Sequence, residues 1–130
     1  MDNHEKINYL EFPAKDIQLA KTFFGQVFGW AFEDYGPDYI ALTNSVSSAG
    51  IDLGFYHAPL ASSTANGSAL VVFYSNTLEQ TQAKIEDNGG TIVKAIFDFP
   101  GGRRFHFTDP NGNEFAVWSD VAASVTEQKT

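Results

Sequence analysis

Residues 14–30 read AKDIQLAKTFFGQVFGW, and the two ends of an α-helix can be recognised within them. Asp16 is suited to the N-cap, where a carboxylate accepts hydrogen bonds from the first backbone N–H groups of a helix. Gly29 is suited to the position just after the last turn, where a left-handed backbone favours glycine. Between them, apolar residues recur at helical spacing: Ile17, Ala20, Phe23, Phe24, Val27 and Phe28. The pattern predicts an amphipathic helix with one buried face.

Strands are predicted on both sides of this helix. Residues 7–12 form an apolar run, and Pro13 is expected to end it. Alternation along a strand gives this run two faces, with Asn8, Leu10 and Phe12 on one and Ile7, Tyr9 and Glu11 on the other. After the helix, short strands fit residues 39–43 and 51–56, with a turn rich in serine and glycine between them. The first half of the chain is therefore a strand, a helix and further strands.

The second half of the chain repeats this order. Residues 69–74 are apolar and β-branched, as expected for a strand. Asn76 with Glu79 resembles a capping box, and the helix that follows is expected to run to about residue 88 and to stop at two glycines. Three further strands fit residues 91–97, 104–108 and 114–118. Between the last two, Asp109-Pro110-Asn111-Gly112 is a tight-turn signal.

The duplicated order predicts an α+β fold of two βαβββ modules, residues 7–57 and 69–119, in a single domain of residues 1–120. Each helix must cover one face of its sheet, which leaves the other face free to curve. Residues 58–68 are small and polar and are expected to be a surface loop. Residues 121–130 lack hydrophobic periodicity and are expected to be a disordered tail.

Composition narrows the classes of function. The chain has 130 residues and a formal net charge of −8, which argues against nucleic acids and anionic membranes as partners. It contains no cysteine, so disulfides, thiolate metal sites and a cysteine nucleophile are excluded. No signal peptide is visible, and no apolar run has the roughly 20 residues of a membrane helix, so a cytoplasmic location is expected.

Four features together resemble the vicinal oxygen chelate superfamily, also called the glyoxalase/bleomycin resistance protein/extradiol dioxygenase superfamily. They are the duplicated β-α-β-β-β order, Ala14-Lys15-Asp16 before a helix containing Ala20-Lys21-Thr22-Phe23-Phe24, the stretch Val27-Phe28-Gly29-Trp30, and Asp109-Pro110-Asn111-Gly112-Asn113-Glu114. The resemblance covers about residues 7–119 and is greatest to the small glyoxalase-like branch whose first helix ends in Phe-Gly-Trp. It implies two modules whose mixed sheets form a curved cup, and a homodimer.

In metal-dependent members of this superfamily, inward side chains from four strands bind a divalent metal that chelates two neighbouring substrate oxygens. The matching positions here are Tyr9, Asp52, about Leu70, and Ala116. Leu70 and Ala116 cannot coordinate a metal, and a neutral tyrosine is a poor ligand. We therefore predict no cofactor and no metal site of the superfamily type. A divalent metal on the atypical set Glu11, Asp52 and His106 remains the alternative.

Polar side chains are expected on the concave side of the second module. Alternation places Arg104, His106 and Thr108 on one face of their strand, opposite Phe105 and Phe107. The two phenylalanines belong under a helix, so Arg104 and His106 should face the cup. His106 titrates near neutral pH and could act as an acid, a base or a hydrogen-bond donor, or have no role.

Two readings of the neighbouring polar residues stay open. Glu11, Asp52, Arg104 and His106 could form a cluster that orients a ligand. Alternatively, Glu11 and Arg104 could be a structural pair that holds two strands in register. Tyr56 and Trp118 share inward parity with Asp52 and Ala116, and could either stack on a planar ligand or fill space.

Two hypotheses of function follow. In the first, the protein binds a small molecule without a metal, using Tyr9, Glu11, Asp52, Tyr56, Leu70, Arg104, His106, Ala116 and Trp118. The acidic net charge would favour a cationic compound. In the second, it is a lyase, isomerase or dioxygenase, similar to lactoylglutathione lyase or to an extradiol dioxygenase, and uses the atypical metal set or His106 as a metal-free base.

Overall fold

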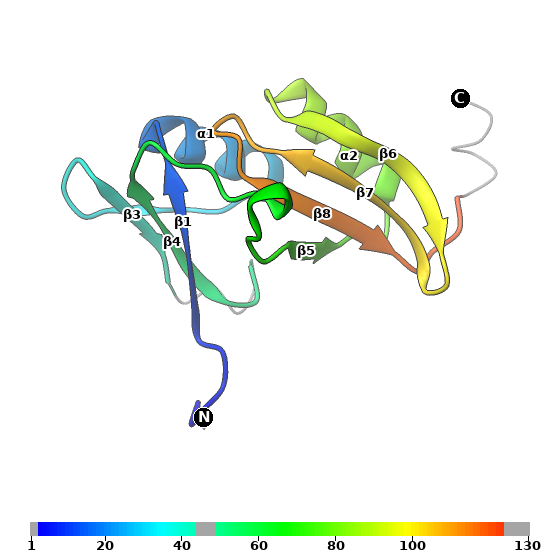
Figure 1. Cartoon of the computed structure of the whole chain (residues 1–130), viewed down its shortest axis with the longest axis horizontal. Coiled ribbons are helices and arrows are strands. Elements are labelled where there is room, and N and C mark those ends of the chain that lie inside the picture. Colours follow the sequence, from blue (N-terminus) through cyan, green and yellow to red (C-terminus); the bar gives the residue numbers. More distant parts are fainter. Residues whose placement is uncertain (1–2, 44–48, 124–130) are drawn as a thin grey trace. The chain divides into compact units, whose positions relative to one another are not determined.

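The computed structural model describes residues 3–43 and 49–123. The chain divides into two compact units, residues 1–61 and 62–130. Each unit has its own helix and its own sheet (Figure 1).

The first unit contains β1 (Tyr9–Ala14), α1 (Ile17–Phe28), β2 (Glu33–Asp34), β3 (Tyr39–Leu42) and β4 (Asp52–His57). Its sheet has the strand order β1-β4-β3-β2, with β1 parallel to β4 and the other pairs antiparallel. The N-cap and the helix end are confirmed. Asp16 accepts hydrogen bonds from the backbone N–H groups of Gln18 and Leu19 at 3.0 and 3.2 Å, and Gly29 adopts a φ of 72°.

An aromatic core joins α1 to the first sheet. The ring of Phe24 is fully buried and stacks on Trp30, with 4.9 Å between centroids. It also contacts Phe55 of β4, at 5.3 Å. Since Phe24 lies on α1, these contacts fix the helix on one face of the sheet and leave the opposite face uncovered by it.

The second unit contains a short 3₁₀ turn (Thr64–Asn66), β5 (Val71–Tyr74), α2 (Leu78–Asp87), β6 (Thr91–Phe99), β7 (Gly102–Thr108) and β8 (Glu114–Ser119). The strand order β5-β8-β7-β6 repeats that of the first sheet, including the parallel pair, here β5 with β8. Figure 1 shows α2 along one face of this sheet. The buried residues between them include Leu78, Ile85, Phe105, Phe107 and Phe115. The predicted α+β fold of two βαβββ modules is confirmed.

Two local predictions are wrong. Pro13 does not end the first strand, because β1 continues to Ala14 at the edge of its sheet, where a residue without an N–H is tolerated. Asn76 does not cap α2. Instead Ser75 Oγ accepts from the Thr77 N–H at 3.0 Å and shares a hydrogen bond with Thr81 at 2.7 Å.

Some predictions remain untested. Residues 44–48 of the predicted turn and residues 124–130 of the predicted tail lie outside the described residues. The single-domain organisation of residues 1–120 stays a prediction. Within residues 3–43 and 49–123, no helix is long and apolar enough to cross a membrane.

Candidate functional site

The two faces of β7 differ as alternation predicted. Phe105 and Phe107 are fully buried on the helix side. Arg103 points to the same side and forms an ion pair with Glu79 of α2, with one N–O distance of 3.2 Å. Arg104 and His106 therefore lie on the face of the second sheet that α2 leaves uncovered, which we call the open face.

The open face contains a hollow of about 350 Å³, here called the Trp118 hollow. It is lined by Val72, Phe99, Gly101, Arg104 and Trp118. All four strands contribute, because the register places Arg104 of β7 opposite Trp118 of β8, while Val72 comes from β5 and Phe99 from β6. Its volume is within the range of small-molecule sites.

Aromatic rings and one guanidinium form the walls of the hollow. The Phe99 ring lies edge-on to Trp118, with 6.2 Å between centroids. Tyr74 packs against Trp118 at 5.2 Å. The Arg104 guanidinium lies 5.8 Å from the centroid of Phe99. A planar ligand would meet apolar rings on its sides and a cation at one end.

His106 lies beside the hollow and accepts a hydrogen bond. Arg104 Nε donates to His106 Nε2 at 3.2 Å, and His106 Nδ1 is 3.7 Å from Glu114 Oε2. Because arginine can only donate, this geometry assigns the proton of the neutral ring to Nδ1. Burial, the Arg104 charge and the Lys94 charge lower the pKa of His106, against the opposing influence of Glu114. His106 is therefore a neutral acceptor for Arg104 at pH 7.

Glu114 is held as a carboxylate by the loop before β5. Its Oε1 accepts hydrogen bonds from the Thr64 N–H at 2.8 Å and the Thr64 hydroxyl at 2.9 Å. These bonds lower the pKa of Glu114. The negative charge thus lies on the far side of His106 from Arg104.

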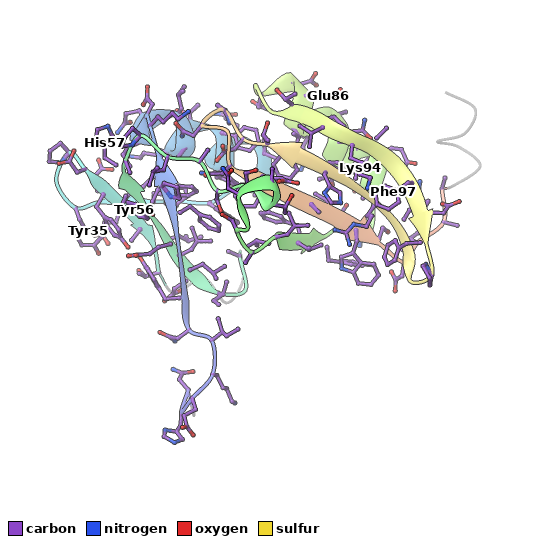
Figure 2. All side chains as sticks on the ribbon, in the orientation of Figure 1. Tyr35, Tyr56, His57, Glu86, Lys94 and Phe97 are labelled. Carbon is purple, nitrogen blue, oxygen red and sulfur yellow. The ribbon has the colours of Figure 1, made fainter. Side chains whose placement is uncertain are left out.

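The first unit has a tyrosine cluster on the face that α1 leaves uncovered. Tyr9 and Tyr39 share a hydrogen bond between their hydroxyls, and Tyr39 also donates to Glu11 Oε2 at 3.0 Å. Burial and these hydrogen bonds raise the pKa of Tyr39, so its phenol stays protonated. Asp52 pairs with Tyr9 in the β1–β4 register. Tyr56 lies on the same strand, β4 (Figure 2). It is 37% exposed.

The sequence-predicted residues divide between the units. Tyr9, Glu11, Asp52 and Tyr56 belong to the first unit, and Leu70, Arg104, His106, Ala116 and Trp118 to the second. Arg104, His106 and Trp118 are brought together on the open face. Leu70 precedes β5, and Ala116 is fully buried at the β8 position paired with His106.

The proposed register pair of Glu11 and Arg104 is wrong, because β1 and β7 belong to different sheets. Across the described parts of either unit, no three His, Asp or Glu side chains gather as they would around a metal ion.

Sequence reasoning missed three residues of the hollow: Val72, Phe99 and Gly101. Val72 could have been found, since it shares the parity of Leu70 and Tyr74. Phe99 lies beyond the predicted end of its strand at residue 97. Simple alternation also fails along β6, because its pairing with β7 is shifted on both sides of Lys94.

Gly54 of β4 leaves the space that the two tyrosine hydroxyls occupy. A Cβ at this position would overlap the hydroxyls of Tyr9 and Tyr39. We expect Gly54→Ala to cost about 2 kcal/mol of unfolding free energy through overpacking. In a Tyr9→Phe/Tyr39→Phe background the cost should fall by about 1 kcal/mol, because the two overlapping oxygens are gone and only the ring carbon of residue 39, at 2.7 Å, still has to move. Urea unfolding of the four proteins measures this coupling, and additive costs would show that the hydroxyls do not fill the space.

The chain matches the model of a known protein family. A family model described as Glyoxalase/Bleomycin resistance protein/Dioxygenase superfamily matches residues 6–117. Among curated proteins, no sequence matches the chain.

Solved structures share the fold at low sequence identity. A glyoxalase-related enzyme from Fulvimarina pelagi is 15% identical with a TM-score of 0.72, covering 88% of each chain. A glyoxalase/bleomycin resistance protein/dioxygenase family enzyme from Burkholderia phytofirmans PsJN is 17% identical with a TM-score of 0.70, covering 88% of this chain and 98% of its own. A lactoylglutathione lyase from Agrobacterium tumefaciens is 16% identical with a TM-score of 0.64, covering 91% of this chain and 96% of its own.

Proposed function

The chain belongs to the glyoxalase/bleomycin resistance protein/dioxygenase superfamily, and we propose that it binds a small organic molecule in the Trp118 hollow without a metal ion. The observation that carries this proposal is the hollow itself, with walls from all four strands of the second sheet. An apolar concavity with one charged group is the usual form of a ligand site.

The chemistry of the donor set supports binding without a metal. The resemblance places metal ligands at Tyr9, Asp52, Leu70 and Ala116, and only Asp52 offers a carboxylate. The Tyr9 hydroxyl is hydrogen-bonded to Tyr39, and Ala116 is fully buried. This set does not fit a divalent transition metal, which binds histidine, cysteine and carboxylate ligands.

The alternative function is a metal-dependent lyase, isomerase or dioxygenase that uses Glu11, Asp52 and His106. One observation favours it: Glu11 and Asp52 lie on the adjacent strands β1 and β4 of one sheet. The contacts of His106 argue against a role as a metal ligand. Its Nε2 lone pair accepts a hydrogen bond from Arg104, and its Nδ1 faces Glu114. A metal would have to displace one of these partners.

Binding can be tested with 2-naphthamide, a neutral planar probe, on protein treated with EDTA. The chain has two tryptophans, so a ¹⁵N spectrum contains two indole N–H signals, and the one missing from Trp118→Phe belongs to Trp118. We expect a saturable shift of the Trp118 signal with a dissociation constant near about 1 mM, from about 0.3 kcal/mol per ligand atom. The signal of Trp30, buried in the first unit, should not move. No shift at Trp118, or a shift only after metal is added, contradicts the proposal.

The metal content of protein purified without a chelator decides between the two functions. Near-stoichiometric divalent metal that is lost in His106→Ala would overturn metal-independent binding. Turnover of the methylglyoxal–glutathione adduct or of catechols, dependent on that metal, would then support the enzyme. The homodimer and the cytoplasmic location remain proposals, and sedimentation equilibrium tests the first of them.

A further inference from the structure

We infer that the ligand of the Trp118 hollow is a planar organic acid whose carboxylate is bound by Arg104. This inference rests on the proposed function, because it names the chemical class of the molecule that the hollow takes. Three features of the hollow support it: the free charge of Arg104, the way in which the Arg104 side chain is held, and the shape of the walls.

The two adjacent arginines of β7 differ in their partners. Arg103 is paired with the carboxylate of Glu79 on the helix side. Arg104 is on the open face, and among the described residues no carboxylate lies within ion-pair distance of it. Its side chain contacts are the neutral ring of His106 and the face of Phe99. The hollow therefore contains a guanidinium whose charge the described protein does not neutralise.

The guanidinium is held in place at one edge. Its Nε–H donates to His106, and its plane lies over Phe99, so these two contacts fix the side chain. In this arrangement the two terminal amino groups are left to bind a ligand, and their spacing matches the two oxygens of a carboxylate. One unit of positive charge beside a neutral His106 suits a monoanion better than a doubly charged phosphate ester.

The walls favour a flat, apolar body attached to that carboxylate. Trp118 and Phe99 present aromatic surface, and Val72 adds an aliphatic wall. A hollow of about 350 Å³ has room for a fused two-ring system. The acidic net charge of the chain favoured a cationic ligand, but the charge that touches a bound molecule here is that of Arg104.

The test compares 2-naphthoate with 2-naphthamide, which has the same shape without the charge. At pH 7.5 and low salt we expect the wild-type protein to bind naphthoate at least about tenfold more tightly than naphthamide. Arg104→Gln should remove this preference, so that the two probes bind this variant with affinities within about twofold of each other. The Trp118 indole signal reports both titrations.

Lys94→Gln is the matched control. This substitution removes the same unit of charge from the neighbouring strand β6, on which Lys94 and Phe97 both lie (Figure 2). The Lys94 ammonium lies 4.6 Å from the ring centroid of Phe97, and Lys94 does not line the hollow. It should leave the preference for naphthoate within about twofold. Equal loss in Lys94→Gln and Arg104→Gln would mean that general charge attraction, not a carboxylate site, causes the preference.

The outcomes separate the two proposals. If neither probe moves the Trp118 signal, the proposed function fails. If both bind with equal affinity to the wild-type protein, the hollow is a ligand site but the inference about an organic acid is overturned.

His106 is expected to act as a positioning residue for Arg104. His106→Leu removes the acceptor of the Arg104 Nε–H and should reduce the preference for naphthoate, whereas His106→Gln, which retains an acceptor, should restore most of it. Naphthamide binding should be equal in both variants. A merely structural loss in His106→Leu would instead weaken the binding of both probes. An unchanged preference in His106→Leu would contradict this role.

Discussion

Gly102→Ala is expected to lower the unfolding free energy of the second unit by about 3 kcal/mol or more. Gly102 begins β7 with a φ of 151°, in a region that residues with a side chain rarely adopt. A Cβ there would overlap the backbone carbonyl oxygen of Ser119 and lie 3.0 Å from its carbon. Backbone in a sheet cannot move aside as a flexible side chain can, so strain and overlap add.

Gly67→Ala separates the cost of backbone strain from the cost of atomic overlap. Gly67 also has a positive φ, 86°, but a Cβ there would meet nothing within 4 Å. It should therefore cost only about 1 kcal/mol, from backbone strain alone. Urea unfolding gives both values. Equal costs for the two variants would show that the close approach of β7 to Ser119 is not a constraint.

The success of the fold prediction came from local signals at the ends of the elements. The Asp16 cap and the Gly29 stop depend only on neighbouring backbone groups, so their residue types were sufficient. The capping box predicted at Asn76 is absent because a distant contact takes its place. Glu79, the expected capping partner of Asn76, is instead bound to Arg103, which is distant in sequence. A contact that forms only in the folded unit overrode a local pattern.

The orientation of candidate site residues was predicted correctly on the strand whose side chains alternate regularly between the two faces of the sheet. Along β7 the buried Phe105 and Phe107 fixed the alternation, and Arg104 and His106 were placed on the correct face. Phe99 was missed because the predicted strand stopped at residue 97, whereas β6 continues to Phe99. The hollow itself could not be predicted, because it depends on the mutual register of four strands and on the turn through Gly101.

Asp109, in the turn between β7 and β8, is expected to make the stability of the second unit depend on pH. Its side chain is 3% exposed, and its Oδ1 accepts from the backbone N–H groups of Asn111 and Asn113, each at 2.9 Å. Burial outweighs these hydrogen bonds and raises the pKa of Asp109 to about 6, from 3.8. The folded state therefore holds this proton more tightly than the unfolded chain does.

The direction of the pH effect follows from this difference. The contribution of Asp109 to stability is fully present below pH 3.8 and is lost as the pH rises through about 6. A difference of about two pKa units corresponds to about 3 kcal/mol. Because asparagine does not titrate, the stability of Asp109→Asn relative to the wild-type protein should increase by about that amount between pH 4 and pH 7.

Asp109→Ala tests the hydrogen-bond acceptor separately from the charge, because both alanine and asparagine are uncharged. Asparagine can keep an acceptor at the Oδ1 position, whereas alanine leaves the two turn N–H groups without one. We expect Asp109→Ala to be about 2–6 kcal/mol less stable than Asp109→Asn at every pH, since each of two unsatisfied buried donors costs about 1–3 kcal/mol. Urea unfolding of the three proteins from pH 4 to pH 7 measures both effects. A parallel pH profile for the wild-type protein and Asp109→Asn would show that this carboxyl group titrates normally, and equal stability of the two variants would show that its oxygen does not hold the turn.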